Sequence, residues 1–180
     1  LVPIGFRQRC LLEDVHEAAQ EARDGRAREV KLCVEREPGA IRGAAVAALG
    51  GGCDFDPACP LSVSFLGEPG EGPGVTREFM GLALQSMLSD ASLWEYEPQL
   101  RTYWFAEPAA DAHRVFHACG ALLGQAVLMG TQLPAALPGV LFAMLLEELG
   151  SPRASPPTLA DLATVQPIIA KGLRELLDYK

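Results

Sequence analysis

The sequence predicts an α+β fold in which helices dominate and a few short strands contribute. Apolar residues make up 49% of the 180 residues, which is typical of a globular chain long enough to bury a core. Several stretches carry apolar residues at helical spacing and end at glycine or proline. Only short runs show the alternation that is typical of strands.

The first third of the chain contains two expected helices and one expected strand. Residues 11–23 have apolar side chains on one face of a helix, and Gly25 is placed to end it. Val30–Val34 is a short apolar run with β-branched residues, which predicts a strand. Residues 40–49 are rich in alanine and predict a helix that stops at the glycines of 50–52.

A strand, a glycine-rich loop and a helix follow one another in residues 61–80, LSVSFLGEPGEGPGVTREFM. Apolar and serine residues alternate over 61–66, which predicts a strand with one buried face. The glycines at 67, 70, 72 and 74 predict a tight connection with positive φ angles. The helix that follows is expected to direct Phe79, Leu82, Ala83, Met87 and Leu88 toward a core.

Two aromatic runs in residues 93–105 flank Pro98 and predict a small hairpin or a bent ribbon. A long helix is expected through Met129, with Asp111 as its N-cap. Gly120 and Gly124 lie one turn apart in that helix, which predicts close approach by another element. A sequence of 32 uncharged residues, 115–146, contains Pro134 and Pro138, so we expect two buried helices and not a membrane span.

The last part of the chain carries clear helix signals. Pro138 suits the first turn of a helix that runs to Leu149. A polar, proline-rich linker occupies residues 151–157. Thr158 and Asp161 have the spacing of a capping box, and residues 167–178 predict a final helix.

Charge and cysteine content exclude some partners. A net charge of −8 disfavours nucleic acid, because phosphate backbones would repel the chain. The five cysteines are odd in number and irregularly spaced, which favours free thiols in a reducing compartment, and we expect the protein to be cytoplasmic. The first residues carry neither an initiator Met nor a signal peptide, so the chain is expected to be a fragment of a larger protein.

Candidate catalytic, metal and cofactor sites are weak. The glycine loop has no lysine where a phosphate-binding loop needs one, and it lacks the third glycine of a dinucleotide fingerprint. His113 and His117 share a helix face but have no motif of metal ligands around them, and Cys53 and Cys59 lack a second ligand pair. We therefore assign no catalytic, metal or cofactor-binding residue and expect no cofactor.

The remaining candidate is a protein-binding face formed by Trp94, Tyr96, Tyr103 and Trp104, with a small aromatic core as the alternative.

The cysteines show no evident activating partner. Cys33 and Cys119 lie in apolar runs, which predicts buried and inert thiols. Cys10 lies, like Cys53 and Cys59, in a polar or loop context without an adjacent histidine.

The order of these motifs resembles the HECT domain of ubiquitin ligases. The strand, the glycine loop and the G-V-x-x-E-F helix are similar to the start of that domain. Later segments resemble it in the same order: RTYWFAEP at 101–108, FHACGALLGQAVLM at 116–129, the leucine-rich helix after Pro138, PTLADL at 157–162 and LLDY at 176–179. Residues 1–29 resemble the helical segment that precedes the domain in the HERC subfamily.

This resemblance implies that residues 30–180 are a partial N-terminal lobe of a HECT domain. It would lack most of the docking subdomain for the ubiquitin-conjugating enzyme and the whole catalytic lobe, whose cysteine carries ubiquitin as a thioester. The implied partners of the full-length parent are ubiquitin or a ubiquitin-like modifier, a ubiquitin-conjugating enzyme and protein substrates. Because no cysteine here matches the catalytic motif, the chain alone is expected to be an inactive scaffold.

A second hypothesis is a non-catalytic interaction module derived from a truncated or degenerate HECT copy. A partial lobe is also expected to expose apolar surface, above all around Ile168, Ile169 and Leu173. The family's usual aspartate and glycine pair in the loop is replaced here by Glu71-Gly72-Pro73-Gly74.

Overall fold

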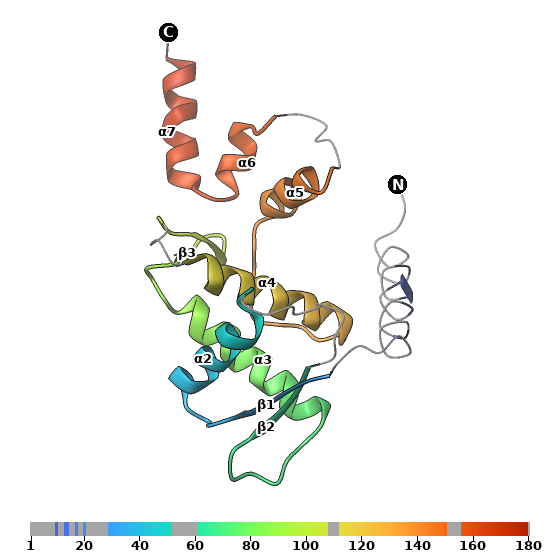
Figure 1. Ribbon diagram of the computed structural model, residues 1–180. Helices are drawn as coiled ribbons and strands as arrows, with labels where there is room; N and C mark the ends of the chain where they lie inside the picture. Colours follow the sequence, from blue (N-terminus) through green and yellow to red (C-terminus); the bar gives the residue numbers. More distant parts are fainter. Residues whose placement is uncertain are drawn as a thin grey trace. The chain divides into compact units, whose positions relative to one another are not determined.

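The fold is α+β and mostly helical, as predicted (Figure 1). It divides into two compact units. Unit 1 comprises residues 1–90 and 109–134, and unit 2 comprises residues 91–108 and 135–180. The computed structural model describes residues 10, 13–14, 17, 20, 29–51, 61–107, 112–150 and 156–179. The predicted N-cap Asp111 and most of the proline-rich linker lie outside these residues, as do Cys53 and Cys59.

The predicted helix at residues 11–23 is described only at some of its polar positions. Cys10, Glu13, Asp14, Glu17 and Gln20 are helical, and the four polar residues among them are exposed. The apolar positions that would form the buried face lie outside the described residues.

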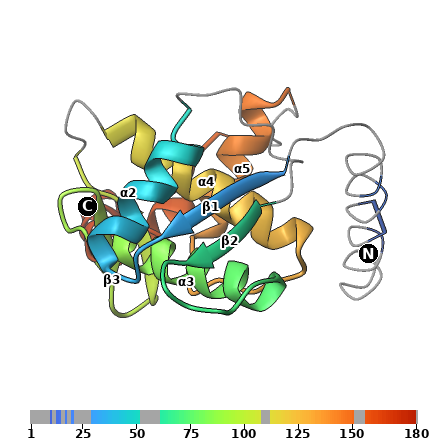
Figure 2. The same cartoon turned by 60° about the horizontal axis from the view of Figure 1, so that its bottom comes forward.

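Unit 1 is built on a pair of parallel strands. Strand β1 (Val30–Val34) pairs with β2 (Leu61–Phe65) in the register that places Val30 beside Leu61 and Val34 beside Phe65. Parallel strands need a crossover, and helix α2 (Pro38–Leu49) lies in that connection. Figure 2 shows the two strands side by side and pointing the same way.

Three helices pack together in unit 1 and form its core. They are α2, α3 (Pro73–Leu88) and α4 (Ala112–Leu128), and each pair of them is in contact. Strand β2 alternates buried and half-buried residues as predicted, and α3 packs against it. The largest fully buried side chains of α3 and β2 include Phe65, Phe79, Met80, Leu84 and Met87. Leu82 was expected in this core but is only half-buried.

Helix α2 ends at a glycine that the packing requires. A Cβ atom at Gly50 would lie 2.3 Å from the carbonyl oxygen of Val46 and 3.1 Å from that of Arg114. A side chain there would clash with the Val46 oxygen and crowd the Arg114 oxygen, so glycine lets the end of α2 approach α4 closely.

Unit 2 contains the predicted hairpin and three helices. Strands β3 (Trp94–Glu97) and β4 (Thr102–Phe105) pair antiparallel, with Trp94 beside Phe105. Helix α5 (Gly139–Glu148) follows, and α6 (Leu159–Ala163) packs against α7 (Pro167–Asp178). The capping box at the start of α6 is present as predicted, since Thr158 and Asp161 bond to each other's backbone N–H groups.

Two predictions about the uncharged stretch were wrong. Helix α4 buries one face, but no residue of α5 is buried, although both helices were expected to be. Apart from the adjoining backbone of α4 itself, no described atom lies within 4 Å of a Cβ atom placed at Gly120 or Gly124, so close approach by another element does not explain these glycines. Within the described part of the chain, no helix combines the length and hydrophobicity needed to cross a membrane.

Candidate functional site

The glycine loop between β2 and α3 is a structural connection with positive φ angles at two of its glycines. Gly67 has φ 78° and Gly72, the N-cap of α3, has φ 104°, which confirms the predicted conformation there. The hydroxyl of Thr76 accepts a hydrogen bond from the Val63 N–H at 3.3 Å and donates one to the Gly72 carbonyl at 3.4 Å. One buried side chain therefore joins the strand, the loop and the helix.

A small hollow of about 220 Å³ lies beside the start of α3. Among the described residues that line it, the charged side chain is the carboxylate of Glu29, which would repel phosphate. The hollow offers no lysine or arginine from the described residues that line it, so its chemistry does not suit a nucleotide.

Arg36 links the glycine loop to the rest of unit 1 through ion pairs. Its guanidinium donates to the carboxylates of Glu68 in the loop and Glu78 on α3, and it lies over the Phe65 ring at 4.0 Å. The hydrogen bonds from Arg36 lower the pKa of Glu68, and both glutamates raise the pKa of Arg36. Sequence reasoning missed this contact, because nothing in the sequence pairs residues so far apart.

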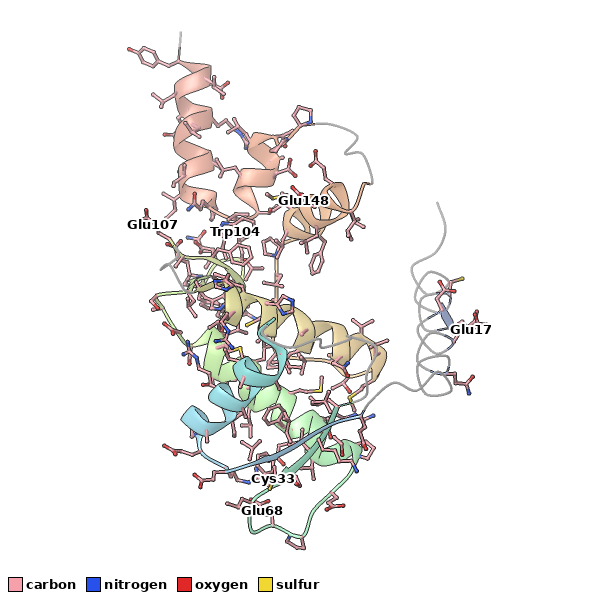
Figure 3. The ribbon with its side chains drawn as sticks, viewed as in Figure 1. Glu17, Cys33, Glu68, Trp104, Glu107 and Glu148 are labelled. Carbon is pink, nitrogen blue, oxygen red and sulfur yellow. The ribbon has the colours of Figure 1, made fainter. Side chains whose placement is uncertain are left out.

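The described cysteines occupy three different environments. Cys119 is buried on α4, its thiol donates to the Met87 sulfur at 3.3 Å, and burial raises its pKa to about 11. Cys10 is half-buried. Cys33 is exposed on β1, so the prediction that it is buried was wrong (Figure 3). The strand alternates its side chains, and Cys33 lies on the outward face.

Of the two histidines considered as metal ligands, His117 has a structural role. His117 bonds through Nδ1 to the carbonyl oxygen of Leu49 at 2.7 Å, and its ring packs 3.6 Å from a Cβ atom placed at Gly51. Because a carbonyl only accepts, Nδ1 carries the hydrogen and caps the end of α2. His113 is exposed. No cluster of three or more potential metal ligands occurs among the described residues.

The hairpin aromatics divide between core and surface. Trp94 is buried and its ring lies 5.1 Å from that of Phe105. The rings of Tyr96 and Tyr103 are 4.9 Å apart, with Tyr96 half exposed. Trp104 is half-buried and points to the opposite face of the hairpin from Trp94. Each of the two alternatives, a protein-binding face and a small aromatic core, is therefore partly confirmed. Trp94 fills the interior, and other aromatic side chains remain accessible.

Helices α5 and α7 expose much of their apolar surface. The expected exposure of Ile168, Ile169 and Leu173 is confirmed, with Ile168 at 73%. The exposed apolar residues of α5 include Phe142, Met144, Leu145 and Leu146, and the C-cap residue Leu149 is exposed as well. Such surface in one compact unit is typical of an interface with another part of a protein or with a partner.

Comparison with known proteins bears on this arrangement. A family model described as HECT-domain (ubiquitin-transferase) matches residues 81–180, more than half of the chain. The chain belongs to this family. The matched region runs from the middle of α3 through the hairpin and α4 to α7, and contains the later motifs on which the resemblance rests.

Curated relatives agree with the HECT assignment. The chain is 32% identical to the probable E3 ubiquitin-protein ligase HECTD2 of Mus musculus over 129 residues, which is 67% of this chain and 17% of that protein. It is 29% identical to the probable E3 ubiquitin-protein ligase HERC4 of Mus musculus over 122 residues, or 67% of this chain and 11% of the relative. The human HERC4 protein matches equally well. This HECT chain therefore spans less than a fifth of the length of these relatives.

Proposed function

We propose that this chain serves as part of a HECT-type ubiquitin-protein ligase, in which it is a structural section of the N-terminal lobe. The observation that carries the proposal is the family match over residues 81–180, supported by similarity to HERC4 and HECTD2. We assign residues 30–180 to this partial lobe and residues 1–29 to the helical segment before it.

The environments of the described cysteines support a scaffold without its own catalytic thiol. A nucleophilic cysteine needs access to its partner and a stabilised thiolate. Cys119 has neither, because it is buried and its pKa is raised to about 11. Cys33 is accessible, but in the described part of the chain no hydrogen bond joins its thiol to a histidine, and the Nδ1 of His117 bonds to the Leu49 carbonyl instead. The thioester of the ligase would form on a cysteine outside this chain.

The partners of the whole ligase follow from the family. They would be ubiquitin or a ubiquitin-like modifier, a charged ubiquitin-conjugating enzyme and protein substrates.

A non-catalytic interaction module is the second candidate, and the exposed apolar faces of α5 and α7 favour it. In either case the chain supplies packing surfaces and no covalent chemistry.

A domain exchange tests the scaffold role. The segment of the HERC4 HECT domain that aligns with residues 81–180 would be replaced by this chain's segment, and ubiquitin ligation would be measured. A scaffold should retain ligation, and a matched exchange that carries Leu122→Asp should lose it, because Leu122 is fully buried on α4. The exchange without Leu122→Asp could fold and yet ligate no ubiquitin. That result would show that this segment is not a working part of the lobe, and it would favour the non-catalytic interaction module.

A further inference from the structure

A shallow apolar groove of about 200 Å³ lies entirely within unit 2. It is lined by residues of the hairpin, α5 and the region of α6, and Trp104, which Figure 3 labels, forms one wall. Val140 and Met144, one turn apart on α5, form another. Leu162 and Val165, in and just after α6, complete the apolar lining.

The size of the groove limits what can bind there. Pockets for cofactors and drug-sized molecules hold roughly 300–1,000 Å³, so this groove is too small for them. It has room for about one large side chain of a polypeptide. Tryptophan and methionine are suited to such a contact, since the first gives a rigid apolar surface and the second adapts its shape.

The charge around the groove is negative. Asp161 lines it and accepts hydrogen bonds from the Thr158 N–H and hydroxyl. Glu95 lies directly across the strand pair from Trp104, and both side chains therefore lie on the same face of the hairpin. Glu148 follows Met144 by one helical turn on α5. No lysine or arginine is among the described residues that line the groove.

We propose that this groove, the Trp104 groove, binds a basic linear segment of another protein through one large apolar side chain flanked by lysine or arginine. The apolar side chain would lie against Trp104 and Met144. The flanking cations would lie near Glu95, Asp161 and Glu148, and their attraction to these carboxylates would orient the segment. The proposal does not depend on the ligase role, because it concerns unit 2 alone.

The binding of a designed peptide tests the proposal. The probe is a short fluorescein-labelled peptide with a single leucine flanked by lysines, and its anisotropy would be followed as the intact chain is added. We expect a Kd on the order of 100 µM, because one anchor and a few exposed charges give a modest free energy. Replacing the leucine by serine in the peptide should weaken binding by about tenfold.

Matched variants distinguish the groove from general attraction between opposite charges. Met144→Ser and Glu148→Lys should each weaken binding several-fold. Leu66→Ser, also an apolar residue changed to serine, and Glu71→Lys lie at exposed positions of unit 1 and should leave binding unchanged. Equal losses in both pairs, or no preference for the leucine peptide, would overturn the proposal. Sedimentation that shows a dimer dissociated by the peptide would also overturn it, because a second copy would then be the occupant.

Discussion

Arg36 donates two hydrogen bonds to the carboxylate of Glu68, from Nε at 2.6 Å and from Nη2 at 2.8 Å. This contact joins the segment after β1 to the glycine loop after β2. It should restrict the motion of an exposed loop with several glycines, because a planar guanidinium fixes both the position and the orientation of the carboxylate. The loop is therefore held by side chains as well as by its own backbone.

Acid should weaken the contact between Arg36 and Glu68. The hydrogen bonds from Arg36 hold the pKa of Glu68 below its ordinary value, so the unfolded chain binds this proton more readily than the folded chain does. The contribution to stability is therefore present above the ordinary pKa and is lost as the pH falls through the lowered one. Glu68→Gln should reduce the free energy of unfolding in urea at neutral pH.

As the pH falls through the acid range, the difference between Glu68→Gln and the unmodified chain should become smaller, because protonation of Glu68 removes the charge on which the ion pair depends. Glu71→Gln, in the same loop but without a described ion pair, is the control and should have little effect at neutral or acid pH. A difference that persists unchanged in acid would contradict the assigned ion pair.

Truncation of Phe79 tests the core of unit 1. This ring is fully buried on α3, and Phe79→Ala should lower the free energy of unfolding by about 3–5 kcal/mol. Leu66→Ala removes an exposed side chain in the same unit and should change stability by less than about 0.5 kcal/mol. Chemical denaturation of both variants would measure the two changes in the free energy of unfolding. Equal changes would show that Phe79 is not packed as described.

The capping box at the start of α6 predicts a graded effect at Thr158. Thr158→Ala removes the acceptor for the Asp161 N–H and should cost about 1 kcal/mol, whereas Thr158→Ser keeps the hydroxyl and most of the stability. The amide of Asp161 should exchange its hydrogen about fivefold faster in the alanine variant. Similar exchange in the alanine and serine variants would argue against the cap.

Alkylation should separate Cys33 from Cys119. At about pH 8, near the ordinary thiol pKa, iodoacetamide should modify the exposed Cys33 quickly and leave Cys119 unmodified in the folded chain. Cys119 should react only after unfolding in urea. Peptide mass spectrometry assigns each site, and rapid modification of native Cys119 would contradict its buried position.

Much of the fold could be predicted because local signals agreed with the packing. The alternation of Leu61, Val63 and Phe65 placed one face of β2 in the core, and the spacing of Thr158 and Asp161 marked the start of α6. The parallel pairing of β1 with β2 was not predicted, because pairing joins residues distant in sequence.

The errors have physical causes as well. Cys33 was expected to be buried because it lies in an apolar run, but a strand with one buried face directs every second side chain outward. The exposure of α5 and the open space beside Gly120 were missed because apolar composition does not say which neighbour covers a helix. The Trp104 groove also escaped sequence reasoning, since three distant segments form it.

The most direct test of the scaffold account is a thioester assay on this chain. The chain would be incubated with ubiquitin, ATP, the activating enzyme and a charged conjugating enzyme, and separated on a non-reducing gel. The account predicts no ubiquitin adduct that a thiol reductant removes. A reducible adduct that disappears when any one of the five cysteines is replaced by serine would contradict it, because the chain would then carry its own catalytic thiol.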